Sequence, residues 1–113
     1  MQSISTGLDS IGYSGIGYKT ADVRAVPLAK KAGECVEAAA EQAYAGKYPL
    51  ARLLYVYTNK DPNQPLDPVR AEFVKYVLSR QGQQAVIKDG YFPITAQLAA
   101  KDAKALGLDQ LTQ

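Results

Sequence analysis

The stretch L-A-R-L-L-Y-V-Y-T, residues 50–58, decides the fold of this chain. It is the only long run dominated by β-branched, aromatic and aliphatic residues, and it predicts a β-strand between Pro49 and the turn signal N-K-D-P at residues 59–62. Residues 53–57 are apolar without a polar alternate, which is typical of a strand that is covered on both faces by helices. We therefore expect the rest of the chain to supply that cover.

The length of the chain is sufficient for one domain with a modest hydrophobic core. The chain has 113 residues, and a chain of this size buries roughly 65% of its unfolded surface. Its net charge of +2 is too small to indicate a nucleic acid or an anionic membrane as partner. No apolar run approaches the ~20 residues that span a bilayer, and residues 1–7 have neither the basic start nor the apolar region of a signal peptide. We expect no nucleic-acid binding, no membrane insertion and no signal peptide in this chain.

The residues that most often support catalysis and metal binding are scarce. Histidine is absent and Cys35 is the single cysteine, which excludes catalytic triads, imidazole metal sites and an internal disulfide. Glu37 and Glu41 are four residues apart on a predicted helix, where they favour a solvated face over an acid/base pair. We predict that the chain is not an enzyme and has no catalytic residue, metal or cofactor.

The first half of the chain predicts two short strands and one helix. Residues 10–20, with glycine at 12, 15 and 17, favour a short strand that enters a tight turn. Residues 22–29 predict a second short strand, which Pro27 places at an edge. Residues 34–45 have the apolar spacing of an amphipathic helix, with Gly33 before it and Gly46 after it.

The second half predicts helices with clear start and stop signals. Asp67 as N-cap and Pro68 at the first helical position predict a helix over 68–80. We expect an interruption at Gly82 and a second short helix over 83–88. Thr95 can cap a last helix over 96–106, which Gly107 ends. The order of these elements predicts an α/β fold.

Two other patterns are better explained by structure than by ligand binding. Gly12, Gly17, Lys19 and Thr20 nearly spell a phosphate-binding loop, but Tyr18 separates Gly17 from Lys19, so we favour a structural turn. The eight tyrosines could stack on bases, yet without a basic groove they favour packing in a core or an interface.

Three segments share their order and spacing with one protein family. They are S-I-G-Y-S-G-I-G-Y at 10–18, A-G-K-Y-P-L-A-R-L-L-Y-V-Y-T-N-K at 45–60, and L-D-P-V-R-A-E-F-V-K-Y-V-L-S-R-Q-G-Q at 66–83 with K-D-G-Y-F-P-I at 88–94. The chain resembles, over almost its whole length, the solute-binding proteins of bacterial phosphate ABC importers. It departs from them at Leu53, where this family often has proline.

The resemblance implies a periplasmic-binding-protein fold of the second type, with two lobes. This chain would be the C-terminal part, a partial lobe with a short mixed sheet flanked by helices. Residues 1–113 would form a single domain, with 1–30 at the end of the second lobe and the crossover, and 31–113 returning to the first lobe. The hinge would lie between Val23 and Ala51, and the location would be periplasmic or extracellular.

The implied function is non-covalent capture of phosphate or a similar oxyanion by the parent protein and its delivery to an ABC permease. The family's main anion-binding motifs are not found in this sequence, so we expect this chain to lack a complete anion site. Tyr13, Ser14 and Gly15 are the candidate ligand-binding residues, because the resemblance places them at the turn after a strand of the second lobe. The alternative is a stand-alone, self-associating interaction module derived from that fold. Exposed sheet edges predict a homo-dimer or a domain swap.

Overall fold

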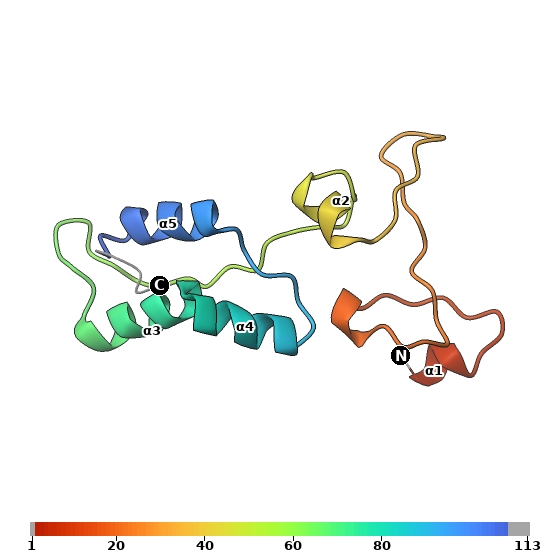
Figure 1. Ribbon diagram of the computed structural model, residues 1–113, viewed down its shortest axis with the longest axis horizontal. Helices are drawn as coiled ribbons and strands as arrows, with labels where there is room; N and C mark the ends of the chain where they lie inside the picture. Colours follow the sequence, from red (N-terminus) through yellow and green to blue (C-terminus); the bar gives the residue numbers. More distant parts are fainter. Residues whose placement is uncertain (1, 109–113) are drawn as a thin grey trace. The chain divides into compact units, whose positions relative to one another are not determined.

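The computed structural model describes residues 2–108 of the chain (Figure 1). These residues belong to two compact units, Met1–Tyr55 and Val56–Gln113. None of the helices in the described part combines the length and apolar character needed to cross a bilayer. The predicted boundary between residues 30 and 31 stays a prediction.

The first unit has little regular structure. Its helical elements are α1 (Gln2–Ser5), the 3-10 helix η1 (Ile16–Tyr18) and α2 (Ala40–Tyr44). Leu28 and Val36 form an isolated antiparallel bridge, in which each N–H donates to the other residue's carbonyl at 2.9 Å. Gly33 turns the chain between them with φ 89°, a left-handed conformation that glycine adopts without strain.

Two side-chain hydrogen bonds connect the residues that follow α2 to the segment around this bridge. The ammonium group of Lys30 donates a hydrogen bond to the carbonyl of Gly46 at 2.7 Å. The hydroxyl of Tyr48 donates to the carbonyl of Val26 at 3.4 Å. Because these groups are exposed to solvent, we expect each hydrogen bond to contribute little to stability on its own.

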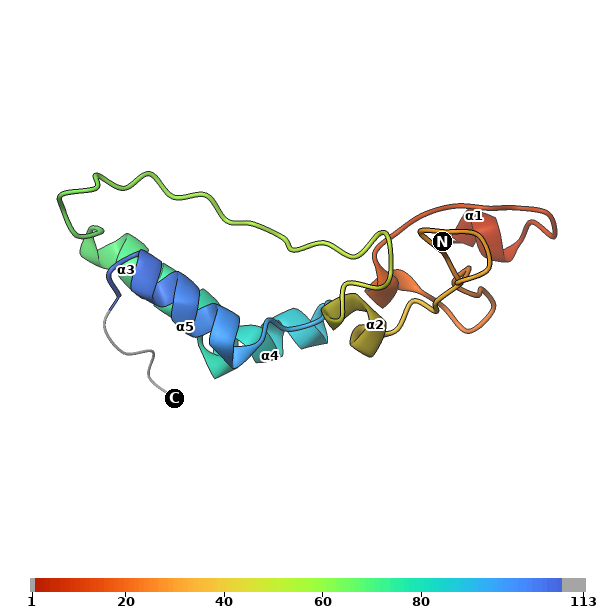
Figure 2. The same cartoon turned by 90° about the horizontal axis from the view of Figure 1, so that it is seen from above.

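The second unit is a helical assembly with its own core. It contains α3 (Pro68–Leu78), α4 (Arg80–Lys88) and α5 (Ala96–Ala105). Helix α3 packs against both α4 and α5, and Figure 2 shows α5 lying along α3. The buried apolar residues of the described chain all belong to this unit, and they are Leu66, Val74, Ala99 and Ala103.

Each helix of the second unit begins at a side-chain cap. The carboxylate of Asp67 accepts from the N–H of Arg70 at 3.1 Å, with Pro68 at the first position of α3. The hydroxyl of Ser79 accepts from the N–H of Gly82 at 3.1 Å, and the hydroxyl of Thr95 accepts from the N–H of Leu98 at 3.3 Å. These bonds satisfy N–H groups that have no partner within the helix.

The helices predicted from the second half are confirmed with corrected bounds, since α3 ends at Leu78 instead of Arg80 and α5 ends at Ala105. The starts at Pro68 and Ala96 are as predicted. Helix α4 begins at Arg80 instead of Gln83, because Ser79 caps it, and Gly82 lies inside the helix instead of interrupting it. The predicted helix over 34–45 is too long, since α2 begins only at Ala40 and Val36 belongs to the bridge.

The predicted strands do not form in this structure. No β-strand is found among residues 2–108, where the bridge at Leu28 is the only β pairing. Residues 10–15 are irregular and lead into η1, and residues 51–60 form neither a helix nor a strand. The short mixed sheet is therefore not confirmed. The physical reason is that a strand requires main-chain hydrogen bonds to a neighbouring strand, and residues 2–108 contain no strand that could pair with 50–58.

Candidate functional site

The predicted ligand-binding residues lie immediately before η1 in the first unit. Tyr13, Ser14 and Gly15 are all exposed, and the side chain of Tyr13 is 99% exposed. The carbonyl of Gly15 accepts a hydrogen bond from the N–H of Tyr18 at 3.0 Å, which closes the turn. Gly15 has φ −63° and ψ 145°, an extended conformation open to any residue. The three residues are adjacent and accessible, and their contact with a ligand stays a prediction.

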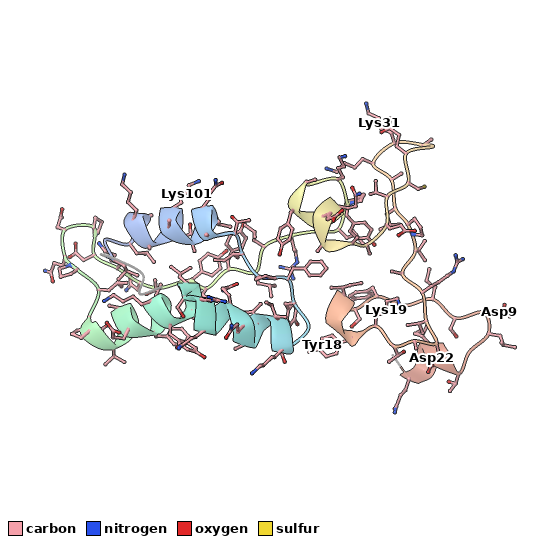
Figure 3. All side chains as sticks on the ribbon, in the orientation of Figure 1. Asp9, Tyr18, Lys19, Asp22, Lys31 and Lys101 are labelled. Carbon is pink, nitrogen blue, oxygen red and sulfur yellow. The ribbon has the colours of Figure 1, made fainter. Side chains whose placement is uncertain are left out.

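The carboxylate of Asp22 lies close in sequence to this turn and interacts with neighbouring polar groups. The pKa of Asp22 lies below its ordinary value because its carboxylate accepts hydrogen bonds from the side chain of Thr20, from its own backbone and from the side chain of Ser5. Figure 3 shows Asp22 beside α1, the helix that carries Ser5. An anion such as phosphate needs several converging donors. The hydroxyl of Ser5 donates to the carbonyl of Gln2 at 2.9 Å, and the negative charge of Asp22 would repel such an anion.

Basic side chains elsewhere are also engaged locally. The guanidinium of Arg70 pairs with the carboxylate of Asp67 at 3.0 Å, and the ammonium of Lys75 pairs with that of Glu72 at 2.9 Å. Both pairs connect residues three apart on a helix. Within residues 2–108 there is also no group of three or more acidic or cysteine side chains that could hold a metal ion. Arg70 and Lys75 are therefore already paired with carboxylates.

A shallow polar depression lies at the junction of α3 and α4. It is lined by Glu72, Lys75, Tyr76, Ser79, Arg80, Gln81 and Gln84. The hydroxyl of Ser79 already donates to the carbonyl of Tyr76 at 2.6 Å and accepts from Gly82. No motif in the sequence predicts this depression. The polar residues at 72, 75 and 79, which recur at helical spacing, were the available signal.

Among the exposed large apolar side chains are two groups of neighbours, one in the extended segment and one on α3. In the extended segment the exposed fractions are 43% for Leu53, 63% for Leu54, 68% for Tyr55, 65% for Val56 and 91% for Tyr57. On α3 the residues Val69, Phe73 and Tyr76 are exposed at spacings of four and three, so they share one face of that helix. Contiguous exposed apolar surface marks a site of interaction.

Comparison with known proteins identifies relatives of the chain. No family model matches it. The phosphate-binding protein PstS of Pseudomonas aeruginosa is 59% identical to it over 109 residues, which are 96% of this chain. The resemblance to phosphate-binding proteins is confirmed. The phosphate-binding protein PstS 2 of Streptococcus agalactiae is 26% identical over 94 residues, or 83% of this chain.

This chain spans about a third of the length of those phosphate-binding proteins. The matched part is 34% of the Pseudomonas protein and 29% of the Streptococcus protein. About two thirds of each relative therefore has no counterpart in this sequence. An anion site that lies mainly in those two thirds would account for the few available donors found here.

Proposed function

We propose that this chain forms about a third of the phosphate-binding component of an ABC importer, which captures phosphate or a similar oxyanion without covalent chemistry. The identity of 59% over 109 residues to a phosphate-binding protein carries this proposal. Both relatives are named for binding, not for catalysis, which favours a non-enzymatic role. In the complete protein the chain would act in the periplasm or outside the cell and would serve an ABC permease.

The contribution of this chain is support of the fold more than contact with the anion. Its basic side chains at 70 and 75 are ion-paired with carboxylates, and the side chain of Thr20 is the main cause that lowers the pKa of Asp22. Within the complete protein, residues 1–30 would end the second lobe and cross over, and residues 31–113 would return to the first lobe. Residues 50–58 would then be a strand of the mixed sheet that the sequence predicts.

The alternative, a stand-alone self-associating module, has no support from the comparisons. The predicted homo-dimer or domain swap also stays a prediction. It would use the exposed apolar residues 53–57, which the complete protein would instead cover. The two possibilities differ in whether this segment pairs with a copy of itself.

A chimaera tests the proposed function. The 109 matched residues of the Pseudomonas protein are replaced by those of this chain, and phosphate binding is measured by isothermal titration calorimetry. We expect one phosphate per molecule, with an affinity within about tenfold of the unmodified protein, a difference of about 1.4 kcal/mol. A chimaera that folds, by its circular dichroism, but does not bind phosphate would contradict the proposal.

The same chimaera tests the candidate ligand-binding residues. If the hydroxyl of Ser14 donates to the bound anion, Ser14→Ala weakens phosphate binding by about tenfold or more, because a hydrogen bond to a charged group contributes about 1.5–3 kcal/mol. Ser10→Ala is the matched control, since Ser10 is also exposed and precedes the same turn. Equal affinities of the two variants would assign Tyr13, Ser14 and Gly15 to packing instead.

A further inference from the structure

The polar depression of the second unit lies where α3 ends and α4 follows it (Figure 1). Its volume is about 590 Å³. Tyr76, which is 52% exposed, is the single aromatic residue of its lining, and the other lining side chains are polar or charged. Covering polar groups without giving them partners costs free energy. We therefore expect this face of the helical unit to stay at the surface of a complete protein.

Some lining side chains have hydrogen-bonding groups that no other described residue uses. They are Arg80, Gln81 and Gln84, and all three are exposed. Other lining groups are engaged, since Lys75 pairs with Glu72 at 2.9 Å and the hydroxyl of Ser79 donates to the carbonyl of Tyr76 at 2.6 Å. A guanidinium offers several N–H donors, and a side-chain amide offers both donors and an acceptor. The free groups therefore lie on the α4 side of the depression.

The charge that remains unpaired in the depression is positive. Glu72 balances the charge of Lys75, so Arg80 is the lining cation without a counter-ion among the described residues. Helix α4 supplies no carboxylate, because its sequence R-Q-G-Q-Q-A-V-I-K contains two basic residues and no acidic one. A guanidinium pairs with a carboxylate through two parallel hydrogen bonds. Charge complementarity therefore favours an acidic partner.

The form and composition of the depression favour a macromolecule over a small ligand. Small-molecule sites are mostly apolar and enclose most of their ligand, whereas this depression is shallow and polar. Tyrosine and arginine are enriched among the residues that contribute most to protein–protein binding. Tyr76 and Arg80 lie together in this lining, which suits contact with a protein.

We propose that this depression is a docking site for an acidic loop of the permease that the complete phosphate-binding protein serves. The inference rests on the proposed function and deepens it by naming the surface and the charge of the partner. A carboxylate of the loop pairs with the guanidinium of Arg80, and Tyr76 supplies the apolar contact. A second copy of this chain suits the depression less well, because a symmetric contact would bring Arg80 against Arg80.

The chimaera with the Pseudomonas protein tests the inference through its binding to the permease of the Pseudomonas importer, held in lipid nanodiscs. We expect Arg80→Glu to weaken this binding by about tenfold or more, because repulsion replaces attraction across the contact. Lys101→Glu is the matched control. It makes the same charge change at an exposed position of α5 outside the depression, and it should bind the permease as the unmodified chimaera does.

Two further measurements separate docking from a general loss of structure. Phosphate binding of the Arg80→Glu chimaera, measured by calorimetry, should equal that of the unmodified chimaera. Raising the ionic strength should reduce the difference between the Arg80→Glu and Lys101→Glu variants, because salt screens exposed charges. Arg80→Gln, which removes the charge without reversing it, should have an intermediate affinity for the permease.

Equal permease binding by the Arg80→Glu and Lys101→Glu variants would overturn the inference. A chimaera that binds phosphate but not the permease would overturn it as well. Both results leave the proposed function standing, because the chimaera still captures phosphate. If the proposed function fails, the unmodified chimaera does not bind phosphate at all, so the two failures are distinguishable.

Discussion

Helices α3 to α5 and the extended segment 50–58 both have apolar patterns, and the helices bury part of theirs, at Val74, Ala99 and Ala103, although Val69, Phe73 and Tyr76 of α3 stay exposed, whereas no residue of 50–58 is buried. Leu66 is 9% exposed in the helical unit, whereas Leu54 is 63% exposed in the extended segment. An α-helix forms its backbone hydrogen bonds within itself, so α3 needs only a short apolar contact to be stable. A strand forms them with a neighbour. The helices therefore complete their backbone hydrogen bonds within the described residues, whereas a strand at 50–58 would require a neighbouring strand.

The largest change in unfolding free energy is expected when the same substitution, leucine to alanine, is compared at a buried and an exposed site. Leu66→Ala removes a buried side chain and should lower the free energy of unfolding of the helical unit by about 2–5 kcal/mol. Leu54→Ala should change it by less than about 0.5 kcal/mol, because that side chain is exposed. Both are measured by denaturant unfolding followed by far-ultraviolet circular dichroism.

The chimaera with the Pseudomonas protein sharpens the same comparison. There we expect Leu54→Ala to become as destabilising as Leu66→Ala, because residues 50–58 would be covered. If Leu54→Ala were strongly destabilising already in the isolated chain, the two regions would not differ as proposed. If it stayed neutral in the chimaera, the segment would not be an interior strand.

Sequence reasoning succeeded where the signals were local. The cap at Asp67, the proline at 68, the cap at Thr95 and the left-handed conformation of Gly107 lie within a few residues of the helix ends they determine. It failed at residues 34–39, where the helical apolar spacing gave way to the bridge between Val36 and Leu28. That pairing joins residues that are separated by a loop, so no local periodicity reports it.

The candidate site could be predicted only in part. The absence of histidine excluded the commonest catalytic and metal sites, and the three matching segments correctly indicated phosphate-binding proteins. Tyr13, Ser14 and Gly15 were chosen from the resemblance. Their contact with a ligand stays a prediction, and about two thirds of the length of each relative has no counterpart in this sequence. The engagement of Thr20 and Ser5 by Asp22 depends on how α1 approaches the turn, which the sequence does not reveal.

Gly82→Ala should have the second largest effect, through the junction of α3 and α4. Alanine is normally the better helix former by about 1 kcal/mol. At this position, however, an added Cβ would collide with the backbone carbonyl oxygen of Tyr76, which cannot move aside as a flexible side chain could. We expect a net loss of about 1–3 kcal/mol in unfolding free energy. Gln84→Ala, at an exposed position of the same helix, is the control. A stabilised Gly82→Ala variant would mean that α3 and α4 do not meet this closely.

Gln83→Ala should have a smaller effect, because it removes polar contacts without forcing helices apart. The amide nitrogen of Gln83 donates to the carbonyl of Val77 at 2.8 Å, and its amide oxygen accepts from the N–H of Ile94 at 2.9 Å. Losing both bonds should cost about 1–2 kcal/mol. Gln83→Glu keeps the acceptor for Ile94 but loses the donor to Val77. Its unfolding free energy should therefore lie between those of the unchanged chain and the Gln83→Ala variant. If Gln83→Ala matched the exposed control Gln84→Ala, this amide would not hold residues 91–94 to α4.

The smallest effect concerns the first unit and is expected in the titration of Asp22. Its folded pKa lies below the ordinary value of 3.8, chiefly because of Thr20 and to a lesser extent Ser5. The associated stability is therefore present above that ordinary value and is lost as the pH falls through the folded pKa. Because Asp22 is fully exposed, solvent screens the contribution. Thr20→Val should raise the pKa of Asp22 more than Ser5→Ala does, as measured by NMR of its carboxyl carbon. The opposite order would mean that α1 holds this carboxylate more firmly than the turn does, and that the first unit is better organised than its scarcity of regular structure indicates.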